Sequence, residues 1–400
     1  MKKAQQVTFL VDMNAFFIGC EALQDPSLKD RPAAVAGDPK KRSGIILTAN
    51  YEARKYGVRT TMTIYQAKKL CPGILLVPPH RKLYEEKSQA VMELLGRYTP
   101  VMEQNSIDEA WLDMTGCEGI WGEPLETARS IMAQINTELG LQCSIGISEN
   151  KFLAKMAAEL KKPQGISTLW QEEVQEKLWP LPVGDLYGIG KQTAAKLQAM
   201  GLHTIGELAA FGKDILRSRF GKYGEEIFLL ANGIDDSPVV PHEEGERKSI
   251  GRSTTMPQDI TDLKSAKDKI ADLAEEVGID LRRLGKKCST VHITVKYADF
   301  QTVTRQQTIP ATDLTRQIVA TAQELLHKNW TNQAVRLLGI SVSGFERTVE
   351  DAQLSFFASQ NDVNKLEKEE KLERTVDSIR DRYGLESVKK AAFLDRKETS

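Results

Sequence analysis

The segment Ser106-Ile107-Asp108-Glu109-Ala110-Trp111-Leu112-Asp113 places two adjacent carboxylates between β-type runs, and Asp12 closes the apolar run 7–11. Side chains alternate faces along a regular strand, so Asp108 and Glu109 can face one site only at a strand junction or turn. Carboxylate oxygens are the ligands that Mg²⁺ prefers, and paired ions can activate a hydroxyl group. The three carboxylates predict a divalent metal site, whereas an Asp-Glu pair alone is more typical of an acidic hairpin tip.

Length and composition bound the class of protein. A chain of 400 residues is too long for one ordinary core and predicts several domains. Its 41% apolar and 27% charged residues are typical of a globular protein. We find no apolar run of about 18 residues and no signal peptide, and we read the five scattered cysteines as reduced. We therefore expect a cytoplasmic protein that contacts no membrane.

The net charge of −1 gives no overall attraction to a polyanion. Nucleic-acid binding would depend on local basic clusters, although such a cluster is more often a solvated face. The candidates are Lys40-Lys41-Arg42, Lys161-Lys162, Arg247-Lys248 with Arg252, and Arg282-Arg283 with Lys286-Lys287.

Residue patterns change along the chain. Residues up to about 170 mix β-branched runs with amphipathic helical stretches, which indicates an α+β fold. The next 60 or so residues are helical. Within them, residues 186–197 resemble a helix-hairpin-helix, a motif whose backbone N–H groups can hold a phosphate. A plain αα-turn is the alternative interpretation. Further on, we expect a βαββαβ unit with strands at 249–255, 290–297, 302–308 and 335–343, and helices at 263–284 and 314–327.

Three motifs resemble those of the Y-family (translesion) DNA polymerases, in family order and spacing. They are residues 12–17 with Cys20 and Glu21, residues 48–59, and residues 106–110. The nearest group is the bacterial DNA polymerase IV type, and the resemblance covers about residues 7 to 357. It implies an α+β, multidomain, right-hand polymerase fold. The implied domains are a palm (1–14 and 80–170), small fingers (15–79), a helix-hairpin-helix thumb (171–237), a linker (238–249), a little finger (250–349) and a tail (350–400).

The resemblance also implies the catalytic chemistry. Asp12, Asp108 and Glu109 would be catalytic and would bind two Mg²⁺ ions, with the Met13 carbonyl completing a shell and Ser106 orienting the acids. The reaction would be attack of a primer 3′-hydroxyl on the α-phosphate of a deoxynucleoside triphosphate.

Nucleotide binding is implied for a second group of residues. They are Phe16, Phe17, Thr48, Tyr51, Arg54 and Lys162. Thr48, Tyr51 and Arg54 are spaced to share one side of a helical turn, and Arg suits bidentate phosphate contact. Phe17 would be the steric gate against a 2′-hydroxyl, although an aromatic ring there is otherwise typical of a core. Asn14, Ile45 and Leu47 depart from the family pattern, which puts metal affinity and lesion tolerance in question.

Contacts with DNA and a sliding clamp are also implied. The DNA-binding candidates are Gly188, Gly190, Lys191, Arg247, Arg252, Lys296 and Arg305. Gln353, Leu354, Phe356 and Phe357 match the clamp-binding peptide of bacterial polymerases. Beyond it lies an apolar stripe, which we expect to dock on the protein itself, followed by a short helix near 386–393. The stripe is Leu366, Leu372, Val376, Ile379 and Tyr383.

The leading hypothesis is distributive, low-fidelity synthesis across damaged templates by a monomer that binds primer-template DNA and dNTPs. A palm-type nucleotidyl cyclase or nuclease, and a non-catalytic DNA-binding accessory protein that retains the fold, are the alternatives. Primer extension with Mg²⁺ and dNTPs separates the three.

Overall fold

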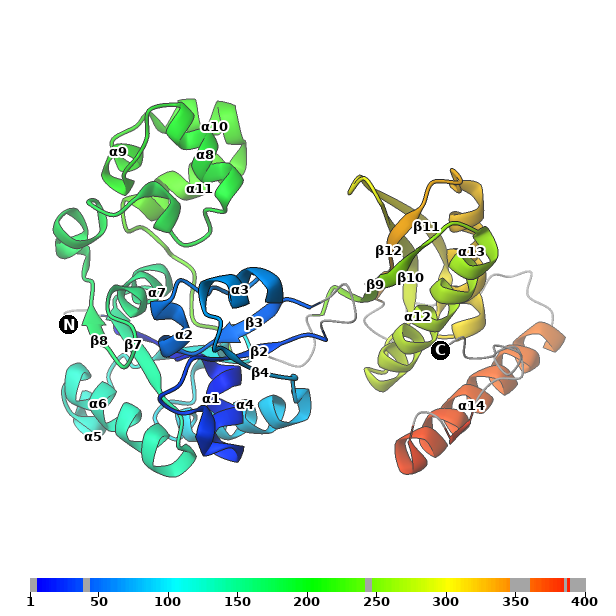
Figure 1. Cartoon of the computed structure of the whole chain (residues 1–400), viewed down its shortest axis with the longest axis horizontal. Helices are drawn as coiled ribbons and strands as arrows, with labels where there is room; N and C mark the ends of the chain where they lie inside the picture. The colour runs from blue at the N-terminus through cyan, green and yellow to red at the C-terminus, as the bar shows by residue number, and fades with distance from the viewer. Residues whose placement is uncertain (1–5, 39–43, 242–246, 346–359, 385–386, 389–400) are drawn as a thin grey trace. The chain divides into compact units, whose positions relative to one another are not determined.

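The computed structural model describes residues 6–38, 44–241, 247–345, 360–384 and 387–388. The chain divides into two compact units, residues 1–39 with 44–243 and residues 40–43 with 244–400 (Figure 1). Each unit has its own hydrophobic core. Within the described residues, no helix is both long and apolar enough to cross a membrane.

A five-stranded sheet in the order β5-β6-β1-β7-β8 organises the first unit. Its central strand β1 runs antiparallel to both β6 and β7. Because side chains alternate along β1, Phe9 and Val11 enter one core while Leu10 and Asp12 face the other side of the sheet. The strands are β1 (Thr8–Met13), β5 (Met102–Gln104), β6 (Glu109–Asp113), β7 (Cys143–Ser148) and β8 (Ile166–Thr168).

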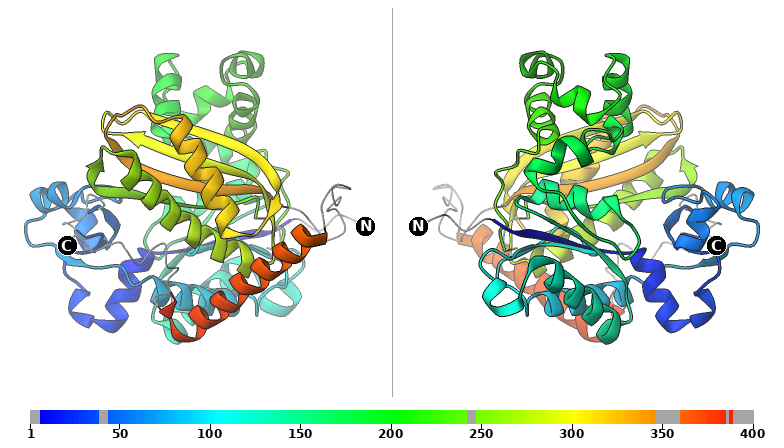
Figure 2. Two further views of the ribbon diagram at one scale, coloured as in Figure 1. Left: turned by 90° about the vertical axis from the view of Figure 1, so that its right-hand side faces the viewer. Right: turned by 90° about the vertical axis from the view of Figure 1, so that its left-hand side faces the viewer.

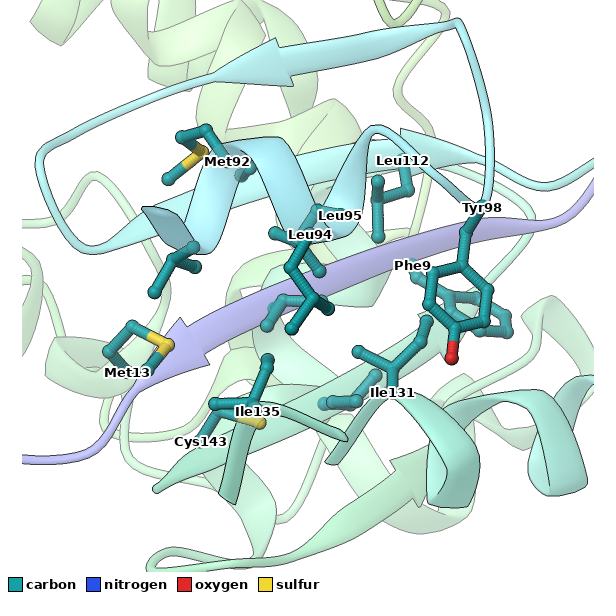
Figure 3. Close-up of a cluster of buried hydrophobic side chains, with 14 of the residues drawn as sticks. Phe9, Met13, Met92, Leu94, Leu95, Tyr98, Leu112, Ile131, Ile135 and Cys143 are labelled. Carbon is teal, nitrogen blue, oxygen red and sulfur yellow. The ribbon is translucent and has the colours of Figure 1, made fainter. Parts of the chain in front are cut away.

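Helices cover both faces of this sheet. α1, α4, α6 and η2 enclose the larger core, in which Leu94 and Leu95 lie over β1 (Figure 3). α7 packs on the opposite face, where Gly146 of β7 allows close approach: an added Cβ would lie 2.0 Å from the Ala154 carbonyl oxygen. The helices are α1 (Phe16–Gln24), α4 (Arg81–Leu95), α5 (Glu118–Trp121), α6 (Pro124–Gln134), the π-helical turn η2 (Ile135–Leu139) and α7 (Lys151–Leu160).

A small sheet in the order β3-β2-β4 forms a separate lobe of the first unit, with its own apolar cluster. Its elements are η1 (Pro26–Leu28), β2 (Ala33–Ala36), β3 (Ile46–Ala49), α2 (Tyr51–Lys55), α3 (Ile64–Leu70) and β4 (Leu75–Val77). Asn50 fixes the start of α2, because its side chain accepts a hydrogen bond from the Ala53 N–H.

The helical part of the first unit packs against α7, since Phe152 and Met156 belong to its core. Gly188 has φ of +93°, a conformation that favours glycine, and Gly190 precedes α8, so the glycines form the expected tight turn. The elements are η3 (Gln171–Glu173), η4 (Val174–Leu178), η5 (Val183–Asp185), α8 (Lys191–Ala199), α9 (Ile205–Ala209), α10 (Lys213–Phe220) and α11 (Lys222–Ala231).

The second unit has the expected βαββαβ order. Its antiparallel sheet, β11-β10-β12-β9, carries α12 and α13 on one face (Figure 2). Alternation along β10 buries Val291 and Ile293, while Thr294 and Lys296 are half-buried on the other side. The elements are β9 (Ser249–Ile260), α12 (Leu263–Arg283), β10 (Cys288–Tyr297), β11 (Thr302–Thr312), α13 (Thr315–Lys328) and β12 (Val335–Phe345).

The last helix, α14 (Gln360–Tyr383), docks on this unit through charged residues, and the described part of its apolar stripe is largely exposed. Leu372 and Tyr383 are 63% and 67% exposed, whereas Asp377 and Arg380 are buried. The expectation that the stripe docks on the protein is therefore wrong. The reason is electrostatic: Arg282 at the end of α12 pairs with Glu373 and Asp377. The clamp-binding peptide 353–357 lies outside the described residues, as does most of the segment expected to form a short last helix.

Candidate active site

The site begins with two opposed carboxylates on neighbouring strands. Asp12, near the end of β1, pairs in register with Glu109, the first residue of β6. On this face of the sheet, Leu10 and Trp111 pack against α7. The alternation of the strands therefore presents both carboxylates to the side on which α7 lies.

Two lysines neutralise these carboxylates. The Lys155 Nζ of α7 lies 2.9 Å from Asp12 Oδ2 and 2.5 Å from Glu109 Oε2. The Lys162 Nζ lies 2.9 Å from the other Asp12 oxygen and 2.8 Å from Glu159 Oε1. These side chains are largely buried: Lys155 is 10%, Asp12 13% and Glu109 14% exposed. The carboxylates thus converge on an ammonium group.

Burial and the neighbouring charges shift the pKa values of Asp12 and Lys155 in opposite directions. Burial tends to raise the Asp12 pKa, but Lys155 and Lys162 outweigh it, so the pKa of Asp12 lies below its ordinary value of 3.8. Burial tends to lower the Lys155 pKa, but Asp12 and Glu109 outweigh it, so the pKa of Lys155 is raised. Both groups therefore stay charged at neutral pH.

Asp108 lies in the bend before β6, where a strand junction was expected. Its Oδ1 accepts a hydrogen bond of 2.6 Å from the Ser106 hydroxyl, and its carbonyl accepts one of 2.9 Å from the Met13 N–H. In the part of the chain that the structure describes, no group of three His, Cys, Asp or Glu side chains could hold a metal ion as arranged. Two of the three predicted ligands nevertheless converge on one cation, and their oxygens suit Mg²⁺.

Asn14 has a structural role. Its buried side chain accepts a hydrogen bond of 2.7 Å from the Gln164 N–H and donates one of 3.0 Å to Ser144 Oγ. These contacts tie the end of β1 to the turn that carries Lys162. The amide at this position therefore supports the site without entering it.

Among the nucleotide-binding candidates, Tyr51 and Arg54 contact each other on α2, whereas Thr48 lies on the preceding strand. The Arg54 guanidinium stacks on the Tyr51 ring, 4.7 Å from its centroid. Burial raises the Tyr51 pKa, while the positive charges of Arg54 and Lys162 oppose the shift. Tyr51 is thus close enough to both cations to sense their charge. Thr48 lies on β3, opposite Val35, so the expectation that it shares a helical turn with Tyr51 and Arg54 is wrong. The helix begins only at Tyr51, because Asn50 caps it there.

The two phenylalanines of α1 differ. Phe16 is buried in the core, whereas Phe17 is half-buried. The Phe17 ring stacks on Tyr84 of α4, with centroids 4.4 Å apart and an interplanar angle of 11°. Phe17 thus has an aromatic support that the sequence motifs did not identify.

Several candidate DNA contacts have partners within the protein. Arg252 pairs with Glu276 and Asp280 of α12, and Arg305 donates to the Asn329 side chain. Lys296 lies over the Phe300 ring, with Nζ 5.0 Å from its centroid. Gly188 and Gly190 lie in the turn before α8, and Lys191 is the first residue of that helix. Arg247 is exposed, two residues before β9 begins.

The basic clusters that the sequence suggested differ in whether their side chains pair with acids of the protein. Arg282, Arg283 and Lys287 pair with acids of α14 and are therefore not a free basic face. Lys162 enters the candidate site, and residues 40–42 lie outside the described residues.

Sequence reasoning missed Lys155. The signal was a lysine within the apolar helical run Phe152-Leu153-Ala154-Lys155-Met156-Ala157-Ala158. A lysine in such a run is buried only if it has an acidic partner.

Comparison with known proteins identifies the family of this chain. Residues 11–159 match the impB/mucB/samB family, residues 247–356 match that family's C-terminal domain, and residues 171–202 match the IMS family HHH motif. The chain is 54% identical to DNA polymerase IV of Clostridium kluyveri, covering 98% of this chain and 99% of that protein. It is 39% identical to DNA polymerase IV 1 of Bacillus subtilis, covering 100% and 96%.

A solved structure shares the fold. A Y-family DNA polymerase chimera, Dbh-Dpo4(243-245)-Dbh, has a TM-score of 0.75 and 27% identity, covering 84% of this chain and 98% of that one. Fold and relatives together define a DNA-directed DNA polymerase with the α+β, multidomain fold expected from the sequence. The chain belongs to the Y family of these enzymes, the impB/mucB/samB family. It therefore binds primer-template DNA and nucleotides.

Proposed function

We propose that this polymerase performs low-fidelity, distributive synthesis across damaged templates, with Asp12, Asp108 and Glu109 as the catalytic metal ligands. The observation that carries the assignment is the convergence of the Asp12 and Glu109 carboxylates on one cation. Two Mg²⁺ ions, when bound, would promote ionisation of the primer 3′-hydroxyl and neutralise charge on the leaving pyrophosphate. The Met13 carbonyl is the further proposed ligand.

The protein's own part is to position the triphosphate. Arg54 and Lys162 bring two positive charges near Tyr51, and Lys162 also contacts the Asp12 carboxylate. A triphosphate held by these cations would have its reacting end beside the carboxylates. Fixed positive charges at such a site stabilise the charge that develops during phosphoryl transfer.

The folded parts suit the roles proposed for them. The five-stranded sheet would be the palm, the small β3-β2-β4 lobe the fingers, α8–α11 the thumb, and the second unit the little finger. The tight turn before α8 would present backbone N–H groups to a DNA phosphate without reading sequence.

Primer extension tests the assignment. Asp108→Ala and Glu109→Ala should each abolish extension while leaving primer-template affinity within a few-fold, because backbone contacts elsewhere dominate DNA binding. Glu103→Gln is a matched control, since Glu103 is an acid of the same sheet that pairs with Lys151. If either alanine variant kept more than a few per cent of activity, that residue would not be a metal ligand.

Damage tolerance and clamp dependence need their own tests. Extension past a panel of defined template lesions, compared with undamaged template, tests bypass.

For the clamp, replacing Leu354, Phe356 and Phe357 with alanine should leave extension on short oligonucleotides unchanged but remove stimulation by a loaded sliding clamp, since an apolar peptide can act as a tether. Full stimulation of that variant would place the clamp contact elsewhere. Sedimentation of the free protein tests the proposed monomer.

A further inference from the structure

A buried carboxylate lies behind the ring on which Phe17 rests. Glu21, one helical turn after Phe17 on α1, is 5% exposed. It accepts a short hydrogen bond from the Tyr84 hydroxyl of α4 and lies 2.9 Å from His80 Nδ1. α1 and α4, both labelled in Figure 1, pack on each other through these side chains.

The Tyr84 hydroxyl is fixed from two directions. It accepts a hydrogen bond of 3.1 Å from the His80 N–H and donates its only proton to Glu21. Burial and the hydrogen bond to Glu21 raise the pKa of Tyr84, so this proton is retained at neutral pH. With the hydroxyl fixed and Tyr84 itself buried, the ring has little freedom to tilt or slide.

This rigidity matters for a steric gate. A gate rejects a ribonucleotide only if its ring does not yield when a 2′-hydroxyl presses on it. Phe17 alone could move at the small cost of leaving its rotamer. Stacked on Tyr84, it can retreat in that direction only by displacing a ring that is hydrogen-bonded to a buried carboxylate.

We propose that Glu21 is a positioning residue for sugar discrimination, acting through the Tyr84 hydroxyl to hold the Phe17 ring in place. This inference rests on the proposed role of Phe17 as the gate. Glu21 touches neither nucleotide nor metal in this scheme. Its effect should appear in the ratio of deoxynucleotide to ribonucleotide insertion.

The size of the effect follows from the bond that is lost. A hydrogen bond to a charged group contributes enough free energy that its removal should lower the discrimination ratio roughly tenfold to a hundredfold. Tyr84→Phe removes the hydroxyl and keeps the ring. Glu21→Gln keeps the shape and a weaker acceptor, so it should have the smaller effect of the two.

The experiment measures kcat/KM for dCTP and CTP opposite template guanine. Tyr98→Phe is the matched control, because the buried Tyr98 hydroxyl has no hydrogen-bond partner among the described residues. The set is completed by the single variant Phe17→Ala and by the double variant that combines Phe17→Ala with Tyr84→Phe. We expect Tyr84→Phe and Glu21→Gln to relax discrimination, Tyr98→Phe to leave it intact, and Tyr84→Phe to add nothing once Phe17 is alanine. Thermal melting verifies that each variant is folded.

The outcomes separate this inference from the proposed gate. If Phe17→Ala admits ribonucleotides but Tyr84→Phe and Glu21→Gln do not, the anchor has no role in discrimination and the inference is refuted. It is also refuted if Tyr84→Phe relaxes discrimination equally with Phe17 absent, because its action would not pass through Phe17. Unchanged discrimination in Phe17→Ala would instead remove the gate itself.

Discussion

Replacing Lys155 with methionine should lower stability without metal and increase the stabilisation that metal gives. Lys155 lies between Asp12 and Glu109. Methionine keeps the apolar stem but removes the ammonium group that Glu109 and Asp12 share, so that Asp12 keeps only its contact with Lys162. A divalent cation would then be the strongest available partner for them.

The magnitude follows from burial. Removing one partner of a buried ion pair costs about 3–5 kcal/mol, and the partial exposure of this group favours the lower end. For a domain of roughly 150–250 residues, 1 kcal/mol corresponds to about 2–4 °C in Tm. We therefore expect Lys155→Met to melt on the order of 6–12 °C below the unmodified protein in chelator.

Thermal melting in chelator, and in Mg²⁺ at equal ionic strength, is the assay. Binding to the folded state alone stabilises in proportion to the logarithm of metal affinity, so the Mg²⁺-dependent rise in Tm should be larger for Lys155→Met. Lys151→Met is the control, since Lys151 lies one turn earlier on α7 and pairs with Glu103 at 2.7 Å. It should lose stability in chelator but keep the ordinary response to Mg²⁺. If Lys155→Met shows the same Mg²⁺-dependent rise in Tm as the control, Lys155 does not compete with a metal ion for Asp12 and Glu109.

Three further predictions concern pH, the last helix and DNA. The pKa of Asp12 in the folded protein lies below 3.8, so the stability that its charge contributes is complete above about pH 3.8 and is lost as the pH falls through the folded pKa. The difference in Tm between the unmodified protein and Asp12→Asn should therefore shrink in that acidic range. Asp377→Ala removes one of the two acids that pair with the buried Arg282 side chain, and it should speed tryptic cleavage of α14 at least about tenfold. Asp381→Ala removes a half-exposed partner of Arg283 and should change the cleavage rate less than about fivefold. Finally, DNA affinity should fall about tenfold to a thousandfold between about 50 and 200 mM salt, as measured by fluorescence anisotropy, and a flat response would show that the basic residues do not face DNA.

The local patterns determined much of the fold. Alternating residues predicted strands 290–297 and 302–308, which the structure has as β10 and β11, and the apolar spacing at 263–284 predicted α12. Such patterns succeed because one buried face repeats every second residue on a strand and every three or four on a helix. The junction before β6 was readable in the same way, since only a bend lets adjacent carboxylates share a site.

The tertiary structure decided which charges meet. Lys155 reaches Asp12 across 143 residues of sequence, and Glu21 meets Tyr84 across 63, so neither pairing leaves a periodic trace. The last helix is the clearest case: its apolar spacing predicted one buried face, yet basic residues of α12 drew its acidic face inward and left Leu372 exposed. Periodicity reports how a segment could be amphipathic, but the surface that the rest of the chain presents selects the face that is buried.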